Sequence, residues 1–180
     1  MKLRERLGFF FVLLFLFSLS GCGKEPAAKI GDVAPDFTLP ALDGREITLN
    51  QYHGKNILLL FWTQGCVFCQ TRGIIMVNEI YRQGQQSGLV VLSINVAESK
   101  GEVAEFVRQK GLVYPVLMDK DASVSRTKYG VYVVPALFII GKDGVIKEKV
   151  YGYLTEQALL DLVEPYLKKK DSISSKKPSE

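Results

Sequence analysis

Runs of apolar and polar residues along the chain predict alternating strands and helices. Two largely apolar segments, 56–62 and 89–96, are typical of strands buried on both faces of a sheet. Further strands are expected at 114–118, 136–140 and 145–150. Glycines or capping residues bound the four expected helices, at 66–86, 102–110, 122–129 and 155–165. The domain therefore alternates strands and helices and ends on a strand pair and a helix.

Two turn signals predict hairpins. The segments 37–39 and 46–49 alternate in polarity around an Asp-Gly pair, and a second Asp-Gly pair lies between the last two strands, at 141–144. Parallel crossovers early in the chain and a hairpin late in the chain favour an α/β fold of three layers. We expect a central mixed sheet, helices on both faces and an N-terminal β-hairpin.

Length and charge narrow the function classes. The chain has 180 residues, 47% hydrophobic and 23% charged, which suits one well-buried core. Its net charge is only +4, and the basic residues form no stripe outside the lysine- and serine-rich tail, 168–180. A nucleic-acid partner is therefore not expected, and the tail is expected to be disordered.

The first residues read as an export signal. A basic start precedes an apolar run from Leu7 to Leu19, and small residues follow before Cys22. The run is too short for a clear membrane span. Leu19-Ser20-Gly21-Cys22 resembles a bacterial lipobox, where the signal is cut before a cysteine that carries diacylglycerol.

We therefore divide the chain into four parts. They are a lipoprotein signal peptide (1–21), a tether (22–30), a domain (31–167) and a disordered basic tail (168–180). The alternative is an uncut signal anchor with an incidental cysteine. Either interpretation places the domain outside the cytoplasm, on the periplasmic side or at the cell surface, where disulfide chemistry is permitted.

The two remaining cysteines, Cys66 and Cys69, are the candidate catalytic residues. Cys66 falls where a buried strand gives way to a helix, so its thiol faces unpaired N–H groups and the positive end of the helix dipole. We expect Cys66 to be the nucleophile. Cys69 lies on the same helical face and is expected to resolve the mixed disulfide. The only redox group is then the Cys66–Cys69 disulfide, with no separate cofactor.

Other roles for the cysteine pair remain open. A zinc site needs four ligands, and beyond the pair the chain adds only His53, so no metal is expected. A purely structural disulfide would close a small ring that restricts the unfolded chain little. Such a disulfide in a non-catalytic binding module is the alternative from another function class.

Several segments together carry a family resemblance, namely 31–39, the strand ending Phe61-Trp62, Cys66-Val67-Phe68-Cys69 and 133–140 with Asp143-Gly144. From about 31 to 165 the chain resembles the TlpA/ResA branch of the thioredoxin superfamily, a domain of the AhpC/TSA-redoxin type. The resemblance implies a thioredoxin-like fold and a membrane-tethered, extracytoplasmic thiol-disulfide oxidoreductase. It also implies protein thiol and disulfide substrates, in some members apocytochrome c, and a membrane thiol electron donor.

The resemblance assigns three residues to substrate binding. Pro135 takes the place of a cis-proline that faces the active-site disulfide, and Val134 supplies free backbone groups for a substrate chain. Trp62 is expected in the core and, as in the family, can also line the active-site surface. The alternative for Pro135 is an ordinary trans proline at the start of a strand.

The chain also departs from the family pattern. Gly65 and Phe68 stand where typical members carry Trp and Pro, and Arg72 replaces a common Glu. No obvious carboxylate is left to take the proton of Cys69. Arg72 could lower a cysteine pKa or be a solvated surface residue.

A peroxiredoxin is the nearest enzymatic alternative. Such enzymes share the Ala-Pro-Asp-Phe opening, and Thr63 matches the threonine of their Pro-x-x-x-Thr-x-x-Cys signature. Leu59 replaces the proline of that signature, however, and a second cysteine three residues later fits exchange better. Whether exchange reduces or oxidises its substrates depends on how each redox state is stabilised.

Overall fold

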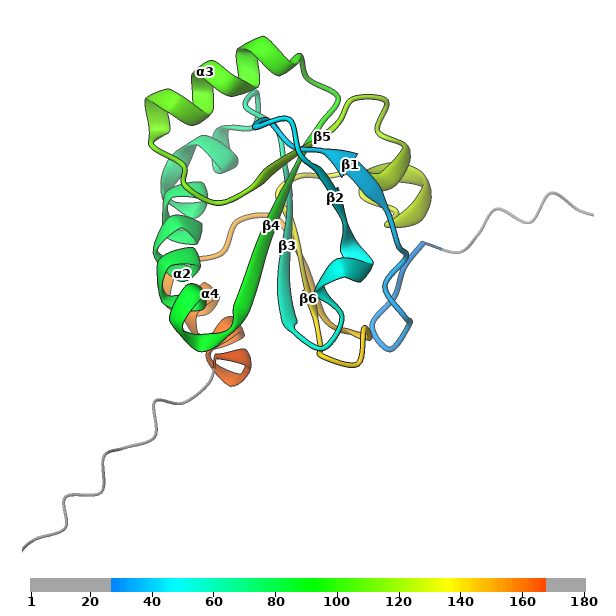
Figure 1. The fold of residues 1–180 in the computed structure, drawn as a ribbon. Helices are drawn as coiled ribbons and strands as arrows, with labels where there is room; N and C mark the ends of the chain where they lie inside the picture. The colour runs from blue at the N-terminus through cyan, green and yellow to red at the C-terminus, as the bar shows by residue number, and fades with distance from the viewer. Residues whose placement is uncertain (1–26, 168–180) are drawn as a thin grey trace, which may run out of the picture.

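A five-stranded mixed sheet forms the centre of the computed structural model, which describes residues 27–167 (Figure 1). The strands lie in the order β5-β4-β3-β6-β7. Their bounds are β3 Asn56–Trp62, β4 Leu89–Val96, β5 Val116–Asp119, β6 Ala136–Ile140 and β7 Ile146–Tyr151. β3, β4 and β5 are parallel, whereas β6 and β7 are antiparallel to their neighbours. The predicted mixed sheet is confirmed.

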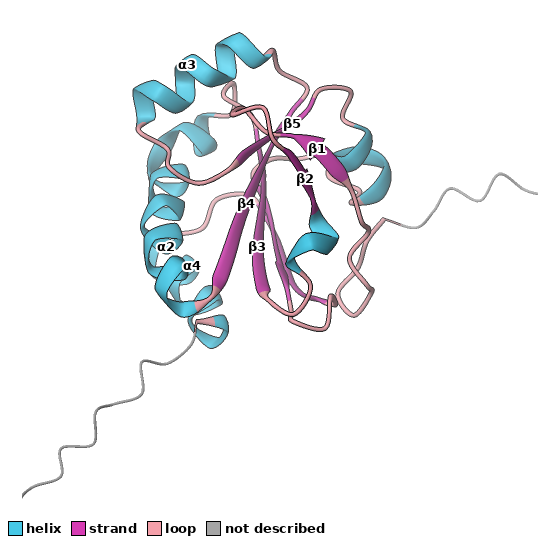
Figure 2. Cartoon of the chain, viewed as in Figure 1, coloured by secondary structure: helices cyan, strands magenta, loops and turns pink. Residues whose placement is uncertain are grey.

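The sheet lies between two layers that differ in kind (Figure 2). The helices α2, α3 and α4 lie on the left of the sheet in Figure 1, and the hairpin of β1 and β2 lies on the right. The helices are α2 Ile74–Ser87, α3 Lys100–Lys110 and α4 Glu156–Val163, and the hairpin strands are β1 Thr38–Pro40 and β2 Glu46–Thr48. Short helical turns complete the layers, η2 Leu49–Tyr52, η3 Cys69–Gly73, η4 Ser123–Lys128 and η5 Glu164–Tyr166.

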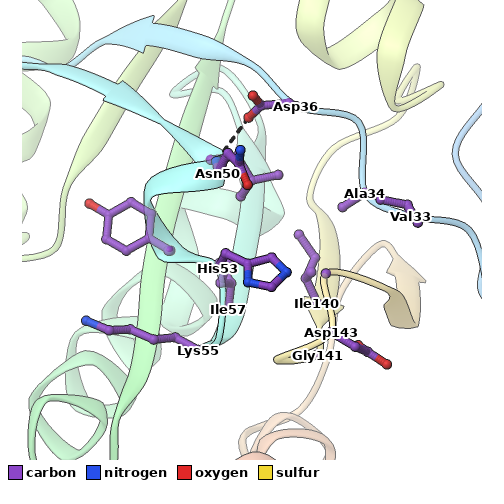
Figure 3. A pocket seen from close by; sticks show the side chains of 13 residues that line it. Val33, Ala34, Asp36, Asn50, His53, Lys55, Ile57, Ile140, Gly141 and Asp143 are labelled. Carbon is purple, nitrogen blue, oxygen red and sulfur yellow. Dashed lines mark hydrogen bonds between the residues drawn. The ribbon is translucent and has the colours of Figure 1, made fainter.

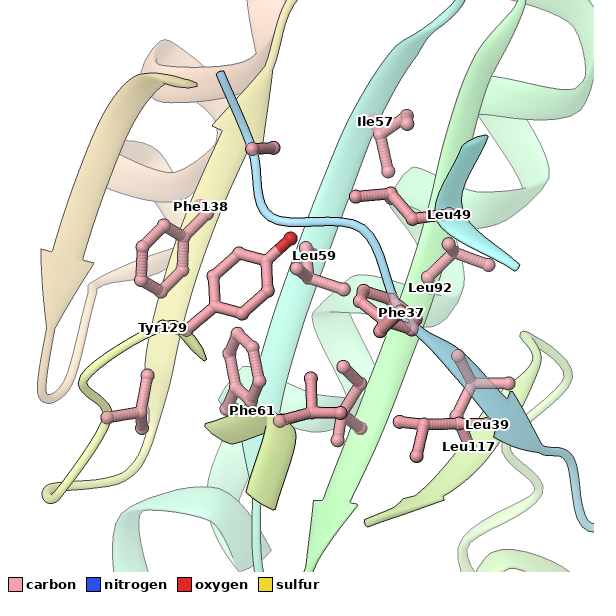
Figure 4. Packing of buried hydrophobic residues seen from close by; sticks show 14 of the residues in the cluster. Phe37, Leu39, Leu49, Ile57, Leu59, Phe61, Leu92, Leu117, Tyr129 and Phe138 are labelled. Carbon is pink, nitrogen blue, oxygen red and sulfur yellow. The ribbon is translucent and has the colours of Figure 1, made fainter. Parts of the chain in front are cut away.

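Both faces of β3 are buried, which explains its unbroken apolar run. Leu59 and Phe61 point into the layer that contains the hairpin, where Phe61 packs on Tyr129 with ring centroids 5.2 Å apart (Figure 4). Leu58, Leu60 and Trp62 point into the layer of α-helices. A strand in this position has no solvent face, so it needs apolar side chains at successive positions.

Capping groups place the helix ends close to where the sequence predicts them. The Thr155 hydroxyl accepts a hydrogen bond from the Ala158 amide at 3.2 Å at the start of α4. Gly88 ends α2 with φ +80°, a left-handed conformation that favours glycine. α3 starts at Lys100 rather than at 102, because the Ser99 side chain accepts from the Glu102 amide.

The described part of the chain is already packed against the domain at its start. Ala28 is 2% exposed, its amide donates to the Lys128 carbonyl, and its carbonyl accepts from the Lys149 ammonium at 2.8 Å. The packing of the domain thus includes residues that the sequence assigned to the tether. The predicted signal peptide, the lipid on Cys22 and the tail 168–180 lie outside the described residues. Within 27–167, no helix has the length and apolar character to cross a membrane.

Candidate active site

The two cysteines lie at the start of the helix that follows β3, and their environments differ. Cys66 precedes the first helical residue, Val67, and is half-buried, whereas Cys69 is only 1% exposed. The Cys69 amide donates to the Cys66 sulfur at 3.1 Å, as to a capping side chain. Both residues are thiols in this structure. The predicted position of Cys66 at a helix N-terminus is confirmed.

The helix that follows Cys66 is not a regular α-helix throughout. After Val67 and Phe68 the chain forms the π-helical turn η3, and α2 starts only at Ile74. The sequence predicted one helix over 66–86 without this wider turn. Turns of this kind occur frequently at functional sites.

Burial keeps Cys69 protonated. Desolvation is the largest cause that raises the pKa of Cys69 to about 12, and the neighbouring Cys66 thiol and the charge of Glu98 act in the same direction. A hydrogen bond with the backbone of Thr63 partly opposes them. Near neutral pH, Cys69 is therefore a neutral thiol.

Glu98 joins the site from a distant part of the sequence. Its carboxylate accepts hydrogen bonds from the amide of Gln64 at 2.8 Å and from that of Gly65 at 3.3 Å. The side-chain amide of Asn95 also donates to it, at 2.5 Å. Sequence reasoning missed this residue. The available signal was an acidic side chain just after β4, because the carboxyl ends of parallel neighbours meet at one edge of the sheet.

The loop before β6 completes the site on the other side of Cys66. The thiol of Cys66 donates to the carbonyl oxygen of Val134 at 3.5 Å. The Val134-Pro135 peptide bond is cis, as the sequence predicted. The structure thus brings Cys66, Val134 and Pro135 together.

Trp62 does not reach the surface. It is fully buried, and its ring packs on Phe106 of α3 with centroids 5.4 Å apart. The expected contact of Trp62 with substrate is therefore not supported, because the side chain fills the core under the site. No hydrogen-bond acceptor lies near its indole N–H among the described residues.

Exposed apolar side chains surround Cys66. We call them the apolar surface: Val67, Phe68, Tyr132, Val133 and Tyr153. Phe68 is 58% exposed, and its ring lies 6.2 Å from that of Tyr153. A small pocket beside these two rings is lined largely by apolar groups and reaches Cys69. The site therefore offers apolar contacts to a binding partner.

His53 belongs to a different region. It lines a pocket with Asp36, Asn50 and Lys55 before the start of β3 (Figure 3). β3 separates this pocket from the cysteines by about 20 Å, at roughly 3.3 Å per residue. Across 27–167, no group of three or more His, Cys, Asp and Glu side chains could hold a metal ion.

Comparison with known proteins identifies close relatives. A model of the AhpC/TSA family matches residues 30–149. The chain is 36% identical over 141 residues to the thiol-disulfide oxidoreductase ResA of Geobacillus thermodenitrificans, covering 78% of this chain and 80% of the relative. It is 33% identical over 146 residues to ResA of Bacillus subtilis, covering 79% and 80%.

Solved structures share the fold. A thiol:disulfide interchange protein of the DsbE type from Chlorobium tepidum superposes with a TM-score of 0.72 at 25% identity, covering 78% of this chain and 99% of the other. A thioredoxin from Neisseria meningitidis gives a TM-score of 0.67 at 25% identity, covering 78% and 93%.

Proposed function

The chain belongs to the AhpC/TSA family and is a thiol-disulfide oxidoreductase with a thioredoxin-like fold, and we propose that Cys66 is its nucleophile and Cys69 its resolving thiol. The hydrogen bond from the Cys69 amide to the Cys66 sulfur carries this assignment. An N–H group aimed at sulfur stabilises a thiolate, and the half-buried Cys66 can meet a disulfide of another protein.

The first step forms a mixed disulfide. The Cys66 thiolate attacks one sulfur of the substrate disulfide, and the bond between the two substrate sulfurs breaks. The second substrate sulfur leaves with the electron pair as a thiolate. The N–H groups at the start of the helix hold the negative charge on Cys66 before the attack.

The second step releases the substrate. Cys69 gives its proton to solvent, its sulfur attacks the Cys66 sulfur, and the bonded substrate sulfur leaves as a thiolate. The substrate has gained two electrons, and the enzyme holds a Cys66–Cys69 disulfide. A thiol donor must then return two electrons to the enzyme, and we assign this role to a membrane thiol protein.

Substrate binding involves Val134 and Pro135. The Val134 carbonyl lies beside the Cys66 sulfur, so an extended substrate chain that reaches Cys66 passes along this loop. Pro135 has no N–H group and therefore donates no competing hydrogen bond there. The apolar surface supplies further contacts with side chains next to the substrate disulfide.

The enzyme acts outside the cytoplasm, held to a membrane by a lipid on Cys22. The apolar run that ends at the Leu19-Ser20-Gly21-Cys22 segment supports this location. Exported proteins whose disulfides must be reduced, including those of cytochrome c maturation, are the proposed substrates. The likeness to proteins named thiol-disulfide oxidoreductase ResA supports disulfide-bonded substrates in general.

The reduction potential of the cysteine pair tests this function. A soluble form that begins near Lys24 is equilibrated with glutathione or dithiothreitol buffers, and its disulfide-reducing turnover is measured with and without Cys66→Ser. A potential near or below roughly −270 mV, the value of thioredoxin, with fast exchange that the variant loses, is the expected result. A potential near roughly −120 mV, the value of the oxidant DsbA, would mean that electrons flow from the substrate to the enzyme.

Two other results would replace the proposal. If the wild-type disulfide exchanges only slowly with thiols, the protein is better explained as a binding domain with a structural disulfide. Faster consumption of hydrogen peroxide than of disulfide would assign the chain to the peroxidases.

A further inference from the structure

Resting on the proposed function, we propose that Glu98 is a positioning residue for the exchange reaction. Its carboxylate fixes the loop that presents Cys66, and its negative charge opposes ionisation of the neighbouring Cys69 thiol. Glu98 touches neither the sulfur atoms nor the substrate chain in this arrangement. It acts through the backbone of Gln64 and Gly65.

The carboxylate supplies the acceptors for the loop between β3 and the helix. Its two oxygens lie 2.8 and 3.0 Å from the Gln64 amide nitrogen, and one lies 3.3 Å from that of Gly65. These two residues directly precede Cys66. Backbone N–H groups in a turn need acceptors, and here a side chain 33 residues away from Gly65 provides them.

Glu98 is itself held in place. The fully buried Asn95 donates its side-chain amide to the carboxylate at 2.5 Å. Ala97, the preceding residue, has φ +58°, which is uncommon for a residue with a side chain. Its amide donates to the Asp119 carbonyl at 3.0 Å. The strand end and this turn aim the carboxylate at the Cys66 loop.

The negative charge of Glu98 contributes to the raised pKa of the Cys69 thiol. Burial is the largest cause of the raised pKa of Cys69, and the Glu98 carboxylate adds to it. The other titratable groups that face Cys69 are Cys66 and the buried Tyr114, among the residues described. A nearby negative charge disfavours ionisation of Cys69, which precedes its attack on the mixed disulfide.

The test uses the full chain and three variants. Glu98→Gln keeps the side-chain size and removes the charge, whereas Glu98→Asp keeps the charge and shortens the reach. Glu79→Gln is the matched control, because Glu79 is an exposed carboxylate on α2, the helix that continues from Cys69. The readouts are iodoacetamide alkylation of the reduced protein against pH, the reduction potential, and kcat and KM with oxidised glutathione.

Each variant has a distinct expected result. Glu98→Gln is expected to move the alkaline limb of the alkylation profile, where Cys69 ionises, to lower pH. Glu98→Asp is expected to keep the wild-type pH profile and to lower kcat at least threefold at unchanged KM. Glu79→Gln is expected to match the wild type in all readouts.

If the alkylation profiles of Glu98→Gln and the wild type coincide, the proposed role of the Glu98 charge is wrong. An equal shift of the profile in Glu79→Gln would also contradict that role. If Glu98→Gln does not fold, Glu98→Asp carries the test, and a wild-type kcat in that variant overturns the positioning role. The alkylation profile needs no exchange activity. A wild type without exchange therefore rejects the proposed function, while the profiles still decide the role of Glu98.

Discussion

The amide of Cys69 donates a hydrogen bond to the sulfur of Cys66 at 3.1 Å, and the two thiols differ sharply in exposure. One sulfur receives an N–H group at a helix start, and the other is 1% exposed in an apolar environment. The first arrangement stabilises a thiolate, whereas the second stabilises a protonated thiol. This asymmetry supports the different steps of exchange that we propose for the two residues.

Replacing Cys69 is expected to stop the reaction after its first step. Cys69→Ser leaves Cys66 able to attack, but the mixed disulfide with the substrate then accumulates. Mass spectrometry after mixing with a disulfide-bonded peptide measures this adduct. Cys66→Ser is the control and is expected to form none. Equal adduct yields in the two variants would contradict the assigned roles.

Stability of the reduced protein is expected to fall at alkaline pH. Because burial raises the pKa of Cys69 from 9.0 to about 12, the folded state holds this proton more tightly than the unfolded chain does. The stabilisation is complete below about pH 9 and is lost as the pH rises toward 12. Urea unfolding in the presence of a reductant, at several pH values, measures the loss.

Cys69→Ala separates this effect from other buried groups. Burial also raises the pKa of Tyr114 and Tyr129, which destabilise the folded state in the same direction at high pH. The variant is expected to lose less stability than the wild type between pH 9 and 12. Parallel curves for the two proteins would contradict the prediction.

Phe68 is expected to contribute to the binding of peptide substrates. Truncation by Phe68→Ala removes aromatic area beside Cys66, and loss of about 1 kcal/mol of binding corresponds to a roughly fivefold rise in KM. The rate with a small disulfide such as cystamine should change little. Val113→Ala, at an exposed apolar residue outside the apolar surface, is the control. An unchanged KM in Phe68→Ala would remove Phe68 from the binding surface.

Gly84 is expected to tolerate no side chain. A Cβ atom at this position would lie 2.8 Å from the carbonyl oxygen of Leu89, where α2 turns back into β4. Gly84→Ala should therefore destabilise the protein by about 1 to 3 kcal/mol. Gly101→Ala in α3 is the control, because its Cβ meets no atom within 4 Å and alanine favours a helix. Thermal unfolding of both variants compares the two helices.

Asp119 is expected to stabilise the turn η4. Its buried carboxylate accepts from the amides of Val124 and Ser125 at 3.2 and 2.7 Å. Asp119→Ala leaves both donors without this acceptor, at a cost of about 3 kcal/mol. Asp121→Ala, at an exposed residue that accepts from Ser123, should cost much less. Equal losses in chemical denaturation would contradict this prediction.

Local patterns predicted most of the fold. The bounds of β3 and β4 agree with the largely apolar segments 56–62 and 89–96. Both faces of these strands are buried, so the sequence does not alternate regularly between apolar and polar residues. Gly88 and Thr155 signalled helix ends through groups that act within a few residues. The cysteine pair was visible for the same reason, since its spacing is local.

Features that depend on distant packing left weaker signals in the sequence, or none. Glu98 reaches the loop before Cys66 only because β4 lies beside β3, and no spacing rule links the two segments. The position of Trp62 was ambiguous, because an aromatic residue at a strand end can face either the core or a cleft. The π-helical turn at Cys69 leaves no composition signal, as it differs from an α-helix by one residue in a turn.

If Cys22 carries the proposed lipid, the packing of Ala28 on the domain limits the distance between the active site and the membrane. Five residue-to-residue steps lead from Cys22 to Ala27, which lies against Gly130, and four more lead from Gly130 to Val134 beside Cys66. At up to about 3.6 Å per residue, these two stretches place the nucleophile within roughly 35 to 40 Å of Cys22. A lipid on that residue would confine the thiols to a thin layer above the bilayer, where a partner in the same membrane meets them at high effective concentration.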